Sequence, residues 1–331
     1  MNLIITKRCD KGCPYCFASH TRNISDKDDV DMSFETFTEM LDKAMPNSHP
    51  KLLGGEPTSH PEFKLFIDEL LKRKLNFTLI SNFLFNETIR NIIIEASKKV
   101  EVSFLINSSN LEDVKGRFDL FANNYNAIYE HLYKDDKEEA MSCGITFENN
   151  KTSEYYIDYM QKLNEKLSGI ERFRISIANP ETKKEDFFIL NNKELGKKFL
   201  TVTQTAITLG FTPSLDCIIY PCMFENKEEW KYIKKFLAKI RTRCEGCPTD
   251  IFPDGTASYC YPLKESIKVD TRKYKTIDQV FDDMNMRYRI LEDRVTHPDK
   301  CKNCPFKKIN MCNGPCLAFF DLSKETLGIN I

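Results

Sequence analysis

Residues 3–16 read LIITKRCDKGCPYC, in which a short apolar run passes directly into a loop that carries three cysteines. Residues 51–57 read KLLGGEP, so a second apolar run passes into a turn of two glycines, a glutamate and a proline. Short apolar runs that alternate with helical patterns are typical of strands in a parallel sheet. Both polar loops therefore follow the C-terminal end of a strand, where α/β barrels place their functional residues.

Apolar runs and helical patterns alternate from residue 3 to about residue 210, which indicates βα units with right-handed crossovers. Six units are fewer than the eight of a closed barrel, so we predict an α/β fold with a partial (β/α)6 TIM-like barrel over residues 1–210. The predicted strands are Leu3–Thr6, Lys51–Leu53, Phe77–Ser81, Val100–Ile106, Met141–Phe147 and Arg172–Ala178. The predicted helices are Phe34–Ala44, Glu62–Lys74, Glu87–Lys98, Leu111–Tyr133, Ser153–Leu167 and Lys193–Leu209.

The sixth predicted strand shows which of its side chains face the barrel interior. Strand alternation turns Phe173 and Ile175 toward the helices and leaves Arg174 and Ser176 pointing inward. An inward arginine is costly unless it meets an anion. We therefore expect Arg174 to have an anionic partner inside the barrel.

The regular alternation ends near residue 211, and we predict a small cysteine-rich domain over residues 211–331. A charged helix is expected at Glu225–Ile240 and another helix at Ile277–Asp293. Between them, Pro253–Gly255 is expected to form the turn of a β-hairpin.

Charge and hydropathy exclude several classes of partner. The 331 residues include 48 Lys and Arg and 49 Asp and Glu, a net charge of −1, which gives no electrostatic footprint for nucleic acid or an anionic membrane. No run approaches the roughly 20 apolar residues of a membrane span, and the start lacks the apolar segment of a signal peptide. We therefore expect a cytoplasmic chain that binds neither nucleic acid nor membrane.

Thirteen cysteines in such a chain indicate metal binding, because disulfides are rare in a reducing compartment. Three lie within the first sixteen residues and nine lie between residues 217 and 316. The remaining one, Cys143, has the same strand parity as Ile145 and Phe147, so we predict that it is a core residue facing the helices.

Cys9, Cys13 and Cys16 place three thiols on one loop. A [4Fe–4S] cluster has four irons, so three cysteines leave one iron open to a small chelating molecule. With His20 they could instead form a structural zinc site of three cysteines and one histidine. A structural zinc loop has no reason to sit at the end of a barrel strand and to precede a Gly-Gly-Glu-Pro turn, which favours the cluster.

The segment TKRCDKGCPYCFA, residues 6–18, resembles the CxxxCxΦC signature of the radical S-adenosylmethionine superfamily, and LLGGEP, residues 52–57, resembles its GGE motif. The resemblance implies that the three N-terminal cysteines hold a [4Fe–4S] cluster whose open iron takes the amino and carboxylate groups of S-adenosylmethionine. It also assigns cofactor contacts to four residues. They are Tyr15, near the adenine, and Gly54, Gly55 and Glu56, at the methionyl ammonium.

Glycines suit this turn because they let a backbone approach a ligand closely. Further cofactor contacts are expected from Pro57 in the same turn and from polar residues at strand ends. These are Ser81, Asn82 and Asn107, together with the inward Arg174.

The C-terminal cysteines resemble the SPASM or twitch extension of that family, which holds one or two auxiliary [4Fe–4S] clusters. The match is imperfect, because the last motif is longer than usual and no cysteine follows Cys316. We assign one cluster to Cys244, Cys247, Cys260 and Cys316, and a second to Cys301, Cys304 and Cys312, completed by Cys222 or Cys217 or left open. A single cluster on Cys244, Cys260, Cys301 and Cys304 and a zinc ribbon are alternatives.

The resemblance implies an oxidoreductase that uses a 5′-deoxyadenosyl radical to take a hydrogen atom from its substrate. We expect a ribosomally made peptide as substrate, modified by a thioether or carbon–carbon cross-link, and an electron donor such as flavodoxin or ferredoxin. The chain begins at its first strand, so the peptide is expected to be recognised by the barrel mouth, the C-terminal region or a separate protein.

Other functions stay open at this point. A small-molecule radical dehydrogenase or rearrangement enzyme and a protein Ser or Cys formylglycine maturase are alternatives, as is a non-catalytic iron–sulfur or zinc protein. No residue is singled out as a catalytic base.

Overall fold

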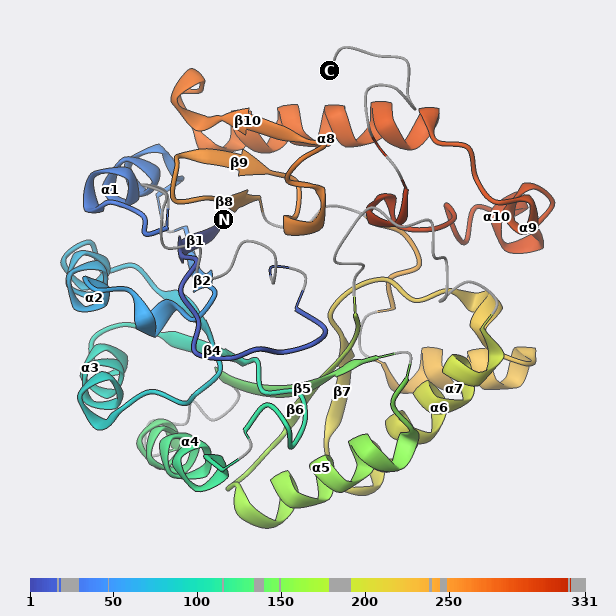
Figure 1. The fold of residues 1–331 in the computed structure, drawn as a ribbon, viewed down its shortest axis with the longest axis horizontal. Helices are drawn as coiled ribbons and strands as arrows, with labels where there is room; N and C mark the ends of the chain where they lie inside the picture. The colour runs from blue at the N-terminus through green and yellow to red at the C-terminus, as the bar shows by residue number, and fades with distance from the viewer. Residues whose placement is uncertain are drawn as a thin grey trace.

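The computed structural model describes residues 1–16, 18, 30–46, 48–114, 116–133, 140–148, 150–178, 192–237, 240–244, 249–320 and 322. Its strands form one ten-stranded sheet in the order β10-β9-β8-β1-β2-β3-β4-β5-β6-β7. The sheet curves into a partial barrel with helices on its outer side (Figure 1). The predicted α/β partial barrel is confirmed.

Seven parallel strands form the barrel wall. They are β1 (Asn2–Thr6), β2 (Lys51–Gly54), β3 (Phe77–Ser81), β4 (Val102–Ile106), β5 (Met141–Phe147), β6 (Arg172–Ile177) and β7 (Thr212–Leu215). The first six match the predicted strands to within two residues. The seventh was not predicted, because it is short and contains Pro213; a proline is tolerated there because β7 is the last strand of the sheet.

Six helices cover the outer face of the wall (Figure 1): α1 (Phe34–Lys43), α2 (Phe63–Lys72), α3 (Glu87–Ser97), α4 (Phe118–Tyr133), α5 (Ser153–Lys166) and α6 (Lys193–Thr208). The predicted start of the fourth helix at Leu111 is wrong. The side chain of Asn110 accepts a hydrogen bond from the Asp113 N–H at 2.9 Å, which forms a tight local turn. Gly116 then has a φ of +69°, which a right-handed helix does not allow.

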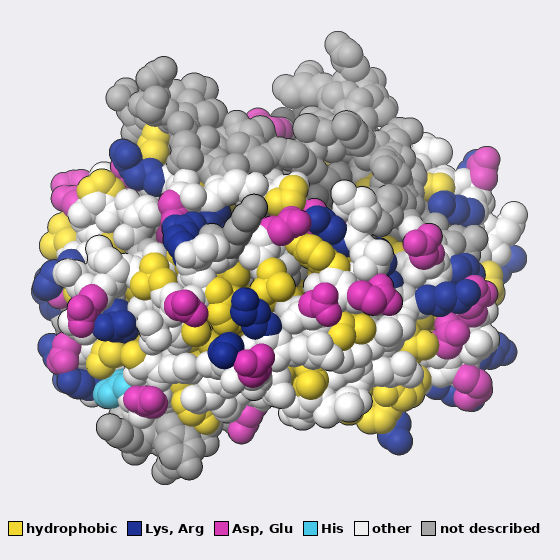
Figure 2. All heavy atoms as spheres, turned by 60° about the horizontal axis from the view of Figure 1, so that its bottom comes forward, with side chains coloured by type: hydrophobic (Ala, Val, Ile, Leu, Met, Phe, Trp, Pro, Cys, Tyr) yellow, Lys and Arg dark blue, Asp and Glu magenta, His cyan; other side chains and the backbone are white. Residues whose placement is uncertain are grey.

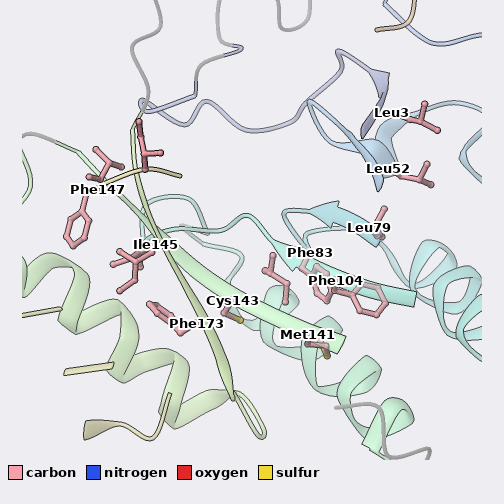
Figure 3. Packing of buried hydrophobic residues seen from close by; sticks show 14 of the residues in the cluster. Leu3, Leu52, Leu79, Phe83, Phe104, Met141, Cys143, Ile145, Phe147 and Phe173 are labelled. Carbon is pink, nitrogen blue, oxygen red and sulfur yellow. The ribbon is translucent and has the colours of Figure 1, made fainter. Parts of the chain in front are cut away.

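The main core lies between the wall and these helices. Figure 3 shows Cys143 among Met141, Ile145 and Phe173, on the side of β5 that faces the helices. Cys143 is only 2% exposed, and burial raises the pKa of its thiol to about 12. The predicted core role of Cys143 is confirmed.

The C-terminal region extends the sheet beyond β1. Strand β8 (Asp250–Ile251) pairs in parallel with β1 and turns back into β9 (Thr256–Ser258), so the predicted hairpin is confirmed. Helix α8 (Ile277–Arg294) lies along the outside of the three added strands in Figure 1. The remaining elements are η4 (Pro221–Met223), α7 (Lys227–Phe236), η5 (Tyr261–Leu263), β10 (Lys268–Asp270), η6 (Thr271–Lys273), α9 (Asp299–Lys302), α10 (Pro305–Lys308) and η7 (Leu317–Phe319).

The predicted charged helix at Glu225–Ile240 is shorter than expected. Asn226 caps it by accepting two backbone N–H groups, and α7 ends at Phe236. The predicted domain boundary near residue 210 falls just before β7, which still pairs with β6. The division into two domains stays a prediction.

The charges on the surface and the polarity of the helices agree with what the composition of the sequence predicts. On the face shown in Figure 2, Lys and Arg side chains are interspersed with Asp and Glu side chains over the described residues. Within the described part of the chain, no helix has both the length and the apolar character that crossing a membrane requires.

Candidate active site

A cavity of about 520 Å³ runs through the barrel interior and reaches the C-terminal ends of the wall strands. We call it the chamber. The three N-terminal cysteines line it, together with all the predicted cofactor contacts except Pro57, which is buried at the start of the 3-10 turn η2 (Pro57–Ser59). Chamber-lining predicted residues are Cys9, Cys13, Cys16, Tyr15, Gly54, Gly55, Glu56, Ser81, Asn82, Asn107 and Arg174.

The two glycines of the turn after β2 pack against the backbone of the N-terminal cysteine loop. The Gly55 N–H donates to the Thr6 carbonyl at 2.8 Å, and the Glu56 N–H donates to the Arg8 carbonyl at 2.7 Å. A Cβ atom at Gly55 would lie 2.2 Å from the Arg8 carbonyl oxygen, and one at Gly54 would lie 2.2 Å from that of Thr6. The structure therefore gives a reason for these glycines that differs from the predicted approach to a ligand: they let the cysteine loop sit directly on the turn.

Glu56 joins the ends of β2 and β3. Its Oε1 accepts hydrogen bonds from the Thr58 N–H and hydroxyl and from the Ser81 hydroxyl, and its Oε2 accepts the Asn82 N–H at 2.7 Å. Burial raises the pKa of this carboxyl, and the four hydrogen bonds oppose that rise. Only Oε2 keeps room for a further donor, so Glu56 fixes the turn and has one oxygen left for a cofactor ammonium.

A buried ion pair lies beneath the cysteine loop. The Lys11 ammonium is 3.8 Å from the Asp113 carboxylate, and both side chains are less than 5% exposed. Asp113 also accepts hydrogen bonds from the Tyr15 hydroxyl and from the Ser109 N–H. Tyr15, predicted to lie near the adenine, thus has its hydroxyl fixed to the protein while its side chain lines the chamber. Sequence reasoning missed Asp113 because it placed this residue inside a helix.

Cys13 lies beside this ion pair. Burial raises the pKa of its thiol to about 12, and the nearby Lys11 ammonium opposes the rise. A metal binds the thiolate, so binding at Cys13 releases a proton near neutral pH.

Asn82 ties the loop to the end of β3. Its amide nitrogen donates to Asp10 at 3.1 Å, and its amide oxygen accepts the Leu84 N–H at 2.8 Å. Asp10 in turn forms an ion pair with Arg117. Asn82 therefore positions the loop between Cys9 and Cys13.

Arg174 points into the barrel and meets an anion, as predicted. Its guanidinium donates to Asp216 at 2.8 Å and to the Asn107 side-chain oxygen at 2.5 Å. Its Nε is buried, and within the described structure it has no hydrogen-bond partner. The Arg174 side chain as a whole lines the chamber.

A row of hydroxyl groups on the chamber wall was not predicted as a site. Ser109 contacts Thr146 at 3.2 Å, and Thr146 contacts Ser176 at 2.9 Å. The same parity that turns Arg174 inward also turns Ser176 inward on β6. Alternation on β5 could have identified Thr146, whereas Ser109 lies in a loop whose path the sequence does not show.

The C-terminal cysteines form two separate groups. In the first cysteine set, burial raises the pKa of Cys217, Cys260 and Cys316, and the nearby Cys244 thiol contributes to each rise. The Cys316 thiol also raises the pKa of Cys260. These four thiols therefore lie within electrostatic reach of one another, and Cys217 also lines the chamber.

The second cysteine set consists of Cys222, Cys301, Cys304 and Cys312. Burial raises the pKa of Cys301 and of Cys312, and the thiols of Cys222 and Cys304 contribute to both rises. All four line a second cavity of about 550 Å³ between α7 and α10.

These two sets change the predicted grouping in one place. Cys244, Cys260 and Cys316 come together as predicted, with Cys217 beside them; Cys247, like His20, lies outside the described residues. Cys301, Cys304 and Cys312 come together with Cys222, one of the two partners predicted for them. The alternative single group would combine Cys244 and Cys260 of the first set with Cys301 and Cys304 of the second set, and it stays a prediction.

Comparison with known proteins identifies the barrel. Residues 3–165 match the family model described as Radical SAM superfamily. This match covers both the N-terminal cysteine loop and the Gly-Gly-Glu-Pro turn.

Crystal structures of SuiB from Streptococcus suis share the fold over almost the whole chain. The structure bound to S-adenosylmethionine has a TM-score of 0.64 at 15% identity, covering 96% of this chain and 72% of SuiB. The structure bound to the precursor peptide SuiA has a TM-score of 0.62 at 14% identity, covering 96% of this chain and 71% of SuiB. At these identities the likeness concerns the fold.

A curated protein of Pyrococcus furiosus is similar over a short stretch. It is described as a tungsten-containing aldehyde ferredoxin oxidoreductase cofactor-modifying protein. The two sequences are 32% identical over 84 residues, which is 24% of this chain and 22% of that protein's length.

Proposed function

Because residues 3–165 match the family model described as Radical SAM superfamily, we propose that the chain is an oxidoreductase that cleaves S-adenosylmethionine and uses the resulting radical to modify a peptide. The observation that carries the proposal is that the cysteine loop, the Gly-Gly-Glu turn and Arg174 all line one chamber. When bound, a [4Fe–4S] cluster with S-adenosylmethionine supplies one-electron cleavage of a carbon–sulfur bond, and the 5′-deoxyadenosyl radical then takes a hydrogen atom from the substrate.

The residues of the N-terminal loop fit this cofactor pair. Cys9, Cys13 and Cys16 supply three thiolates, one fewer than the four irons of a cluster. The loop is fixed by the glycine turn below it and by the buried Lys11–Asp113 pair beside it. Among the described residues, no three His, Cys, Asp or Glu side chains converge on a single metal ion.

The polar groups of the chamber have separate tasks in this proposal. The methionyl ammonium donates a hydrogen bond to Glu56 Oε2, which can accept one more. It also contacts the main chain of Gly54 and Gly55. The Arg174 side chain, which lines the chamber, contacts the cofactor in this proposal. Ser81, Asn82 and Asn107 hold these groups in place through their own hydrogen bonds. The chamber volume of about 520 Å³ lies within the range typical of ligand sites.

The two C-terminal cysteine sets are proposed to hold two auxiliary [4Fe–4S] clusters within a cysteine-rich region from residue 211 onward. Four thiols suffice for each cluster. The first set borders the chamber through Cys217, so its cluster can take up the electron that the substrate radical gives up on oxidation. The second set lines the second cavity, and we propose that a one-electron carrier such as flavodoxin or ferredoxin docks there.

The peptide substrate is supported by the fold shared with SuiB, which has been crystallised with its precursor peptide. The chemistry proposed is a cross-link or another oxidation of a peptide side chain. A second candidate is modification of a small molecule, because the Pyrococcus relative is described as acting on an enzyme cofactor.

The test is anaerobic reconstitution with iron and sulfide, followed by reduction in the presence of S-adenosylmethionine. We expect about twelve irons per chain, four for each of three clusters, and formation of 5′-deoxyadenosine. A fully loaded protein that forms no 5′-deoxyadenosine would rule out the proposed activity. Deuterium transfer into 5′-deoxyadenosine from a labelled peptide or a labelled small molecule would then separate the two substrate classes.

A further inference from the structure

Two short stretches of chain link the two C-terminal cysteine sets. Residues 217–222 supply Cys217 to the first set and Cys222 to the second. Residues 312–316 supply Cys312 to the second set and Cys316 to the first. The two sets are therefore held at a fixed separation by two covalent connections.

Tyr220 lies inside the first of these connections and is fully buried. Its hydroxyl oxygen accepts the Cys316 N–H at 2.9 Å, which ties it to the second connection. A tyrosine phenol is protonated at neutral pH. Along the chain Tyr220 lies three residues after Cys217 and two residues before Cys222, so it stands between a member of each cysteine set.

The hydroxyl of Tyr220 still has a hydrogen to donate. A phenol whose oxygen accepts one hydrogen bond can still donate one through its own O–H. Among the described residues, no acceptor pairs with this O–H. A buried donor without an acceptor costs about 1–3 kcal/mol. A cluster bound at the first set would bring sulfur acceptors near this hydroxyl, because the hydroxyl is hydrogen-bonded to the backbone N–H of Cys316, a member of that set.

We infer that Tyr220 is a positioning residue that couples the two auxiliary sites. Its hydroxyl donates to a sulfur of the cluster at the first set, and its ring fills the space between the two clusters. Hydrogen bonds to cluster sulfur raise the reduction potential, so Tyr220 favours uptake of the electron from the substrate radical. With clusters bound at both sets, one electron would pass from the first cluster to the second and would then reduce a one-electron carrier protein, while Tyr220 would keep its proton and its electrons. The inference rests on the proposed auxiliary clusters.

Tyr259 provides a comparison within the same site. Its hydroxyl lies 3.6 Å from the Cys244 sulfur, and its ring stacks on Tyr288 at 4.2 Å between centroids. Tyr259 contacts the first set but belongs to neither of the two connecting segments, residues 217–222 and 312–316. Removing the Tyr259 hydroxyl therefore affects the first cluster without disturbing the link to the second.

The test is an anaerobic redox titration of the reconstituted full chain, followed by electron paramagnetic resonance. The variants are Tyr220→Phe, which keeps the ring, Tyr220→Leu, which removes it, and Tyr259→Phe. Tyr156→Phe is the matched control, because Tyr156 is equally buried and its hydroxyl accepts the Glu148 N–H at 2.7 Å away from the cysteine sets. Variants Cys260→Ala and Cys304→Ala each remove one signal and so assign the two auxiliary clusters.

Tyr220→Phe is expected to keep its iron and sulfide and to shift the first auxiliary signal to a more negative potential. An exchangeable proton coupled to this cluster, seen by electron–nuclear double resonance in the wild type, is expected to disappear. Tyr220→Leu is expected to slow reoxidation of the first cluster by an external one-electron acceptor, whereas Tyr259→Phe shifts its potential without slowing that step.

Two outcomes would overturn the inference, and they differ from failure of the proposed function. If Tyr220→Phe loads fully but leaves both the potential and the coupled proton unchanged, Tyr220 does not act on the cluster. If Tyr220→Leu and Tyr156→Phe reoxidise at the wild-type rate, the ring does not couple the sites. A wild-type chain that binds only about four irons would instead refute the auxiliary clusters themselves.

Discussion

The N-terminal loop and the C-terminal cysteine sets both bring several thiols together, but they do so in opposite ways. The loop takes its three cysteines from eight consecutive residues on one strand end, and its support comes from nearby turns. Each C-terminal set takes four cysteines from segments up to about a hundred residues apart, and the two sets share their connecting segments. A local motif is therefore readable from spacing, whereas a set assembled from distant segments depends on how the sheet extends.

The largest effect is expected from breaking the local set. Cys13→Ala should remove about four irons and reduce 5′-deoxyadenosine to background, because no other described residue replaces its thiol in the loop. Iron analysis and product quantification measure both. Residual 5′-deoxyadenosine near the wild-type level would show that the loop does not hold the cofactor.

The distant sets can be tested one cysteine at a time. Cys217→Ala and Cys222→Ala should each remove about four irons but retain cleavage of S-adenosylmethionine, because the N-terminal loop remains complete. Cys247→Ala serves as the comparison. Loss of iron in Cys247→Ala with full loading in Cys217→Ala would restore the grouping predicted from the sequence.

The support beneath the loop is tested by Gly55→Ala. The added Cβ would lie 2.2 Å from the Arg8 carbonyl oxygen and 2.9 Å from the Cys9 Cβ, so the loop must shift. We expect loss of the N-terminal cluster together with a destabilisation of about 1–3 kcal/mol. Gly210→Ala is the control: its Cβ meets nothing within 4 Å, and its φ of +84° costs about 1–2 kcal/mol without loss of iron.

The smallest effect is expected where the N-terminal and C-terminal regions meet, at the pairing of β1 with β8. Asp250 on β8 accepts a hydrogen bond from the Asn2 side chain on β1 at 2.6 Å, and burial raises the pKa of Asp250 to about 6. The folded state therefore binds this proton more tightly than the unfolded state, so stability rises as pH falls through 6. Relative to Asp250→Asn, the wild type should gain about 1 kcal/mol between pH 7 and pH 5.

Denaturant unfolding at several pH values measures this difference. A difference between the two proteins that does not change with pH would show that Asp250 is charged in the fold at both pH values.

The barrel could be predicted closely because its strands are short apolar runs separated by helical patterns. The prediction failed where a local interaction overrides periodicity, as at Asn110 and Gly116 before α4. Strand β7 escaped detection because an edge strand tolerates Pro213 and needs no long apolar run.

Only part of the site could be predicted, because a residue is found from the sequence only if it belongs to a motif or a regular pattern. Motif residues of the chamber were found because they follow strand ends, and Arg174 was found by parity. Asp113 and Thr146 were missed, since neither belongs to a motif. Cys217 was predicted only as a possible fourth ligand of the second cluster, because spacing alone does not show that residues 217–222 divide their two cysteines between two sites.

The pairing of β1 with β8 has a consequence for biosynthesis. Asn2 and Asp250 are separated by 248 positions, yet they are neighbours in the sheet. At a synthesis rate of about 5–20 residues per second, one edge of the first strand stays open for roughly 12–50 seconds after it leaves the ribosome. An open strand edge is a site of aggregation. The nascent barrel is therefore protected from misassembly at this edge only once its C-terminal hairpin has been translated.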